Sequence, residues 1–125
     1  MKKGNLTLLF FVLLAACQSP PERNCNDFKT GSFEFLSVID GKESKSRFTR
    51  TNDLEIEFFE GRQDTATVRW VNDCEYVLKR LNPESKAEEK PIVIKILTTT
   101  DDSYTFEYGV VGDSKRLRGT ATKID

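Results

Sequence analysis

The 125-residue sequence contains no histidine, the side chain on which most hydrolytic triads and acid–base mechanisms depend. It has only three cysteines, and zinc sites are built mainly from histidine and cysteine. A glycine-rich phosphate loop is also missing. Basic and acidic residues nearly balance, at 19 and 20, whereas nucleic-acid-binding proteins carry a concentrated basic surface. We therefore expect a protein that is not an enzyme, uses no cofactor or metal and binds no nucleic acid.

Three local clusters offer weak alternatives to this interpretation. A Ser-Lys dyad could form within residues 42–46, but a solvated lysine-rich loop explains them better. Residues 101–103 lack the ligand spacing of a calcium loop and are typical of an acidic hairpin turn. Glu55, Glu57 and Glu60 could supply paired carboxylates, yet residues two apart on a strand satisfy that separation trivially. We predict that these glutamates form a solvated face.

Long apolar runs are scarce. The longest, residues 6–16, follows two lysines and is too short for a bilayer span, which needs about 20 residues. Its length is typical of a signal peptide. The run ends in Leu14-Ala15-Ala16-Cys17, which resembles the bacterial lipobox. That resemblance implies cleavage before Cys17, a diacylglycerol thioether on its sulfur, and acylation of the new N-terminus, typically with palmitate.

These features divide the chain into three parts. We predict a lipoprotein signal peptide over residues 1–16, the lipidated Cys17 with a proline-containing tether over residues 17–24, and a folded domain over residues 25–125. Several acyl chains on one residue would hold the protein on a membrane. In enteric bacteria an Asp directly after the lipidated cysteine retains lipoproteins in the inner membrane, and Gln18 stands there instead. The expected location is the cell envelope, at the outer membrane facing the periplasm.

Cys25 and Cys74 are the two cysteines of the predicted domain. An exported chain sits in an oxidising compartment, where an even pair usually bridges. A redox or nucleophilic role would need an activated thiolate with a nearby base. We predict a structural disulfide, which would close about 50 residues and contribute about 4 kcal/mol in the chain-entropy model.

The rest of the domain shows strand-like alternation interrupted by turn signals. At its centre, two such runs meet at Asn72-Asp73, whose side chains favour a tight reversal. About eight runs recur at this spacing without a long helix, which predicts an all-β fold. Short consecutive turns favour an antiparallel up-and-down meander closed into a small lipocalin-like barrel, and a β-sandwich is the alternative. The predicted strands cover residues 31–38, 46–51, 54–59, 65–71, 74–81, 92–96, 104–110 and 116–123.

Large apolar side chains recur at period two within these runs. An eight-stranded barrel is just wide enough inside for its own side chains or for one small ligand. Side chains of this size favour a filled core over a ligand pocket. The residues expected in one role or the other are Phe33, Phe35, Phe48, Ile56, Trp70, Tyr76, Ile94, Phe106 and Tyr108.

Three stretches, residues 25–33, residues 69–76 and Gly119-Thr120-Ala121, together resemble a group of small cell-envelope lipoproteins from flavobacteria and other Bacteroidota. The similarity covers nearly all of the predicted domain and implies an envelope location and this fold. Members of the group are often labelled DNA topoisomerase IV, a label that the residues here contradict, because no ATP-binding or DNA-gripping element is present.

The sequence therefore favours a non-catalytic envelope lipoprotein that binds a small apolar or amphipathic ligand. The alternative is a structural lipoprotein with a filled core that binds another envelope protein.

Overall fold

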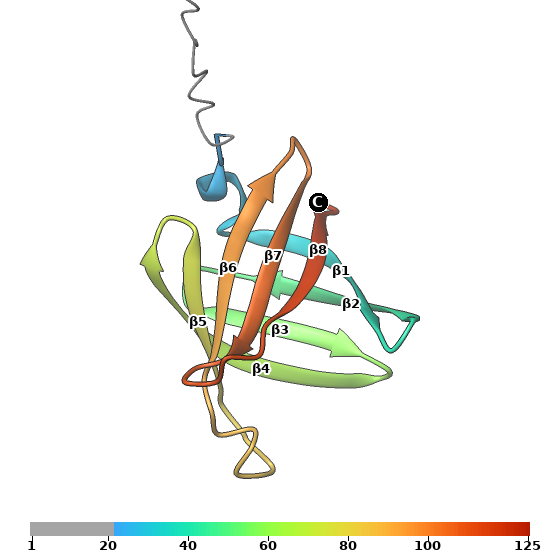
Figure 1. Ribbon diagram of the computed structural model, residues 1–125, viewed down its shortest axis with the longest axis vertical. Coiled ribbons are helices and arrows are strands. Elements are labelled where there is room, and N and C mark those ends of the chain that lie inside the picture. The colour runs from blue at the N-terminus through green and yellow to red at the C-terminus, as the bar shows by residue number, and fades with distance from the viewer. Residues whose placement is uncertain (1–21) are drawn as a thin grey trace, which may run out of the picture.

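Figure 1 shows a computed structural model of the protein, which describes residues 22–125. Eight antiparallel strands follow one another in sequence order around a closed barrel, and the last strand pairs with the first. This arrangement confirms the predicted all-β, up-and-down barrel. The elements are the 3₁₀ helix η1 (Cys25–Phe28) and the strands β1 (Gly31–Ile39), β2 (Lys42–Arg50), β3 (Leu54–Phe59), β4 (Arg62–Asn72), β5 (Glu75–Arg80), β6 (Ile92–Thr99), β7 (Ser103–Val110) and β8 (Leu117–Lys123).

The predicted signal peptide, Cys17 and most of the tether lie outside the described residues. Within residues 22–125, no helix is both long enough and apolar enough to cross a bilayer.

Short turns set the order of the strands. Asp40-Gly41 and Glu60-Gly61 each join two strands with positive φ at both residues, 52° and 77° in the first pair and 49° and 74° in the second. These values are those of a two-residue type I′ turn, whose twist matches that of the flanking strands. At the central hairpin, the side-chain oxygen of Asn72 accepts a hydrogen bond from the backbone N–H of Cys74 at 3.0 Å. Local turn chemistry therefore produces the meander.

The alternation of strands gives the barrel two different ends. We call the end that carries η1 and the β2–β3, β4–β5 and β6–β7 connections the capped end. We call the opposite end, with the β1–β2, β3–β4, β5–β6 and β7–β8 connections, the mouth. In Figure 1 η1 lies at the upper end of the barrel, and the long β5–β6 connection extends from the lower end.

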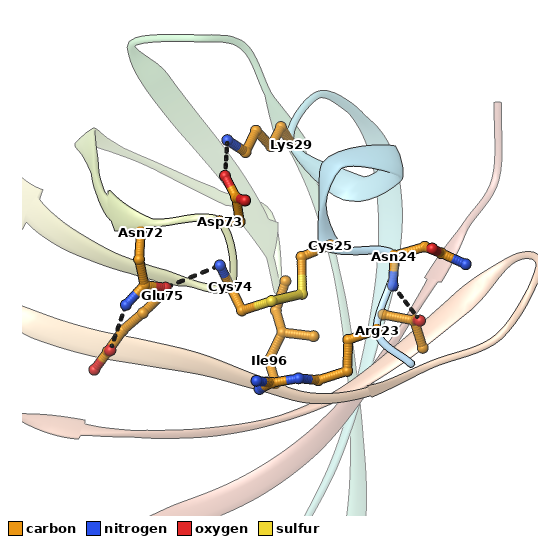
Figure 2. Close-up of a disulfide and its surroundings, with 10 residues drawn as sticks. Arg23, Asn24, Cys25, Lys29, Asn72, Asp73, Cys74, Glu75 and Ile96 are labelled. Carbon is orange, nitrogen blue, oxygen red and sulfur yellow. Dashed lines mark hydrogen bonds and ion pairs between the residues drawn. A yellow bond between two sulfur atoms is a disulfide. The ribbon is translucent and has the colours of Figure 1, made fainter. Parts of the chain in front are cut away.

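A short helix and a disulfide close the capped end. Phe28 of η1 is 1% exposed and its ring lies 5.2 Å from that of Tyr104. Cys25 and Cys74 form the predicted disulfide, with their Cα atoms 5.2 Å apart, which links η1 to the β4–β5 turn (Figure 2). Next to it, Arg23 donates a hydrogen bond to the carbonyl of Ile96 at 2.9 Å. The start of the domain is thus fixed across the end of the barrel.

Most of the predicted core residues lie in the barrel interior. Five of them are buried: Phe33, Phe48, Tyr76, Ile94 and Phe106. Three others, Phe35, Trp70 and Tyr108, are partly buried and pack against that core. These eight side chains pack together in one cluster between the strands.

Strand β3 is oriented differently from the prediction. Its register places Glu55 opposite Ala66 on the inner wall, and Glu55 is only 7% exposed. Ile56 therefore belongs to the outer row with Leu54 and Phe58, and it is not part of the core cluster. The prediction of a solvated glutamate face is wrong for Glu55. Hydrophobic alternation places charged residues outside the barrel, and it does not account for a buried cation that can pair with this carboxylate.

Candidate functional site

The interior of the capped end is occupied by one charged side chain, Arg50, at the end of β2. Its side chain has no exposed surface, and it forms an ion pair with Glu55. Arg50 Nη1 donates hydrogen bonds to Glu55 Oε1 at 3.0 Å and to the Tyr76 hydroxyl at 2.6 Å. Nη2 donates to the Tyr104 hydroxyl at 3.1 Å. The guanidinium thereby joins strands β2, β3, β5 and β7.

The same group also binds the backbone of the cap. Arg50 Nη2 donates to the carbonyl of Phe28 at 2.6 Å, and Nε donates to the carbonyl of Lys29 at 3.1 Å. With its side-chain partners, this gives five hydrogen bonds for the five N–H donors of a guanidinium. A buried charge is tolerated when it is paired and fully hydrogen-bonded. Here the five protein partners replace the water molecules that the guanidinium of Arg50 loses on burial.

Aromatic rings surround the guanidinium. The Tyr76 ring centroid lies 4.6 Å from Arg50 Cζ, and that of Phe33 lies at 5.0 Å. Phe48, Trp70 and Tyr104 follow at 5.4, 5.7 and 5.9 Å. Each distance is within the range of a cation–π contact, which strengthens when the cation is desolvated. The capped half of the barrel is therefore a packed polar and aromatic core.

This environment shifts the pKa values of the whole cluster. Burial alone would lower the pKa of Arg50, but the oxygens of Tyr76, Tyr104 and Glu55 raise it above its usual value. Burial raises the pKa of the Tyr76 and Tyr104 hydroxyls, which therefore remain neutral donors and acceptors. Burial also raises the pKa of Glu55, and the charge of Arg50 opposes that shift. The cluster acts as a structural unit that keeps Arg50 positively charged.

The mouth contains the candidate binding site. A pocket of about 60 Å³, enough for a few water molecules, opens between strands β3, β4, β5 and β6. Its charged lining residues are three carboxylates, Glu55, Glu57 and Asp64, and two cations, Arg80 and Lys90. The apolar residues of its lining are Ala66, Leu78 and Ile92. We call the cavity formed by these eight residues and Thr65 the mouth pocket.

Two carboxylates face each other directly across the β3–β4 pair in this pocket. Glu57 is the registered partner of Asp64 on the inner wall. Like charges directly opposite one another destabilise a sheet. Although Glu57 is exposed at the mouth, partial desolvation raises its pKa, the carboxylate of Asp64 raises it further, and Arg80 opposes the shift. The pocket therefore has an incompletely balanced negative charge at Glu57.

The cations of the mouth pocket are distributed unevenly. Arg80 Nη1 lies 3.7 Å from Asp64 Oδ2 and donates a hydrogen bond to Glu88 Oε1 at 3.0 Å. Arg80 is thus shared between two carboxylates. Within residues 22–125, neither Glu57 nor Lys90 forms an ion pair within 4.0 Å. The site combines one guanidinium engaged by two carboxylates with a further carboxylate, Glu57, and an ammonium, Lys90, that form no ion pair in the described residues.

An apolar hollow adjoins the mouth pocket. It measures about 220 Å³ and shares Ile92 with the pocket. Tyr108 lines this hollow, and burial, followed by the charge of Glu57, raises the pKa of its hydroxyl. The other residues of the hollow are Gly109, Val110, Asp113, Lys115 and Leu117. The mouth therefore offers an apolar surface beside a charged one.

Ser46 and Lys45 lie on opposite faces of β2 and do not form a dyad. Ser46 faces the barrel interior at 7% exposure, whereas Lys45 lies outside, 3.7 Å from Glu34. The Ser46 hydroxyl is the buried side-chain polar atom in the described part that lacks a hydrogen-bond partner. Over the same residues, no cluster of three or more metal-ligating side chains is present.

Comparisons of the chain with protein-family models, with curated proteins and with solved structures found no match. The function must therefore be argued from the geometry of the barrel itself.

The first prediction concerns Arg50. Arg50→Met should lower the free energy of unfolding by about 3–5 kcal/mol, because it leaves Glu55 buried without its cation. Arg50→Met/Glu55→Leu should recover part of that loss, since it removes both charges. Urea denaturation followed by Trp70 fluorescence measures both effects. Surface substitutions usually change the free energy of unfolding by less than about 1 kcal/mol. A change no larger than this in Arg50→Met would contradict the structural role of Arg50.

The second prediction concerns Glu57. Because its pKa is raised in the folded protein, its contribution to stability is present below the unfolded pKa and is lost as the pH rises through the folded pKa. Glu57→Gln should therefore raise the melting temperature at pH 7 by about 2 °C, and the difference should vanish near about pH 4. Glu60→Gln, which removes the same charge in the exposed turn, is the control. Destabilisation by Glu57→Gln at pH 7 would contradict the predicted imbalance of charge.

Proposed function

We propose that the protein is a non-catalytic lipoprotein of the bacterial cell envelope that binds a small amphipathic ligand at the mouth of its barrel. The lipid on Cys17 would provide the membrane contact, and the outer membrane facing the periplasm is the proposed location. The single observation that carries the binding proposal is the position of Arg50. Its guanidinium and the surrounding rings occupy the interior of the capped half, which leaves the mouth as the open end of the barrel interior.

The mouth suits such a ligand better than the interior does. The mouth pocket carries charged groups, and the hollow beside it carries Tyr108, Val110 and Leu117. Ligand sites usually combine a mostly apolar lining with a few placed polar groups. A molecule with a short apolar chain and a charged or polar head matches this combination.

The fold also supports the direction of the proposed anchor. The described chain begins at Glu22, next to η1 at the capped end (Figure 1). A lipid on Cys17 would therefore attach the capped end to the membrane and leave the mouth directed away from it. The Cys25–Cys74 disulfide is consistent with the oxidising compartment that this location requires.

The third prediction tests the anchor. Protein purified from the membranes of its native host should start at Cys17 and carry the added mass of its acyl chains. Cys17→Ser should abolish the added mass and shift the protein from the membrane to the soluble fraction, because the two or three acyl chains are the proposed attachment. Intact-mass spectrometry and membrane fractionation measure these changes. An unmodified parent protein with its leader retained would refute lipid anchoring.

The fourth prediction tests binding at the mouth, using the Cys17→Ser protein and three six-carbon probes: 1-hexanol, hexanoate and hexylammonium. At least one probe should shift the backbone amide resonances of Leu78, Ile92 and Tyr108 in nuclear magnetic resonance spectra, because these residues line the mouth. The resonances of Trp70 and Tyr104 should stay unchanged, since the capped end is filled. Shifts confined to the capped end, or no shifts with any probe, would overturn the proposed function.

A further inference from the structure

We propose that the mouth selects ligands that carry a primary ammonium group on a short apolar chain, and that Glu57 receives this ammonium. This inference rests on the proposed binding at the mouth and specifies the ligand's chemical class. It is carried by the register of the β3–β4 pair, by the distribution of ion pairs in the mouth pocket, and by the apolar hollow next to it.

The register brings three carboxylates into the pocket, and one of them forms no ion pair in the described residues. Glu57 and Asp64 are directly opposite each other, and Glu55 is two residues from Glu57 on the same inner face. Glu55 is bonded to Arg50, and Asp64 lies 3.7 Å from Arg80. Glu57 alone among these three carboxylates has no cation within 4.0 Å in the described residues. A ligand ammonium at this position would relieve the repulsion between Glu57 and Asp64.

The same distribution disfavours an anionic head group. Arg80 is already shared between Asp64 and Glu88, so a ligand carboxylate would have to compete with two carboxylates of the protein. Lys90 could attract an anion, but that anion would also face Glu57 and Asp64 in the same pocket. The balance of charges therefore favours a cation.

An ammonium also suits the remaining geometry. It has three donors, and carboxylates accept charge-assisted hydrogen bonds that are stronger than neutral ones. Ile92 lines both the mouth pocket and the apolar hollow, so it connects the two parts of the site. A chain attached to the ammonium could extend over Ile92 and Leu117, which also line the hollow. The hollow, at about 220 Å³, has room for a short chain.

The fifth prediction tests this selectivity with the same three probes on the Cys17→Ser background. Hexylammonium should bind about tenfold more tightly than 1-hexanol or hexanoate, as expected for one charge-assisted contact. Glu57→Gln should reduce this preference to about twofold or less, because it keeps the shape of the side chain and removes its charge. Glu60→Gln, with the same change of charge in the β3–β4 turn, should keep the tenfold preference. Amide resonance shifts give the dissociation constants and show whether each variant keeps its fold.

The possible outcomes separate the two proposals. If 1-hexanol or hexanoate binds at the mouth as tightly as hexylammonium, the ammonium inference is wrong, although binding at the mouth stands. If Glu60→Gln removes the preference as strongly as Glu57→Gln, general surface charge explains it, and Glu57 is not the receiving group. If none of the probes binds at the mouth, the proposed function itself fails.

Discussion

Arg50 bonds to more parts of this protein than an apolar side chain could, because its five donors reach the cap and three other strands from one position on β2. Removing a guanidinium from water costs several kcal/mol unless every donor finds a partner. That requirement fixes the directions from which the partner groups must approach the guanidinium. Phe28, Tyr76 and Tyr104 must present their oxygens at fixed angles, so the cap can close the barrel in one arrangement. The disulfide then limits how far η1 can move from this arrangement.

The same cluster determines what reaches the mouth. In a strand, a slip of one residue exchanges the inner and outer faces. Glu55 is opposite Arg50 in the β2–β3 register, and this pairing turns the carboxylates of β3 inward and leaves Leu54 and Phe58 outside. Glu57 follows two residues later on the same face. The carboxylate that we assign to ligand binding is therefore positioned by the Arg50–Glu55 ion pair, which starts two residues away and extends from the mouth pocket into the capped end.

Much of the fold could be predicted from the sequence, because strands and turns depend on neighbouring residues. Asn72-Asp73 and Asp40-Gly41 form the hairpin turns that their turn chemistry predicts, and the disulfide was predicted from the expected export of the chain. The orientation of β3 could not be predicted in this way. Its apolar and acidic residues alternate equally well in both orientations, and the hydrophobic pattern favours the wrong one. Arg50 and Glu55 flank the same turn, which is the signal that a search for cross-strand charge pairs would detect.

The mouth pocket was harder to foresee for a related reason. Its defining feature, Glu57 opposite Asp64, depends on the β3–β4 register and on the inward orientation of both strands. Repulsion of this kind lowers stability, and functional sites are where such local conflicts are retained. The protein can tolerate the conflict because its principal stabilising contacts, the Arg50 cluster and the disulfide, lie at the capped end. Glu57, the carboxylate that we propose receives a ligand, can therefore stay without an ion pair while the Arg50 cluster and the disulfide keep the capped end closed.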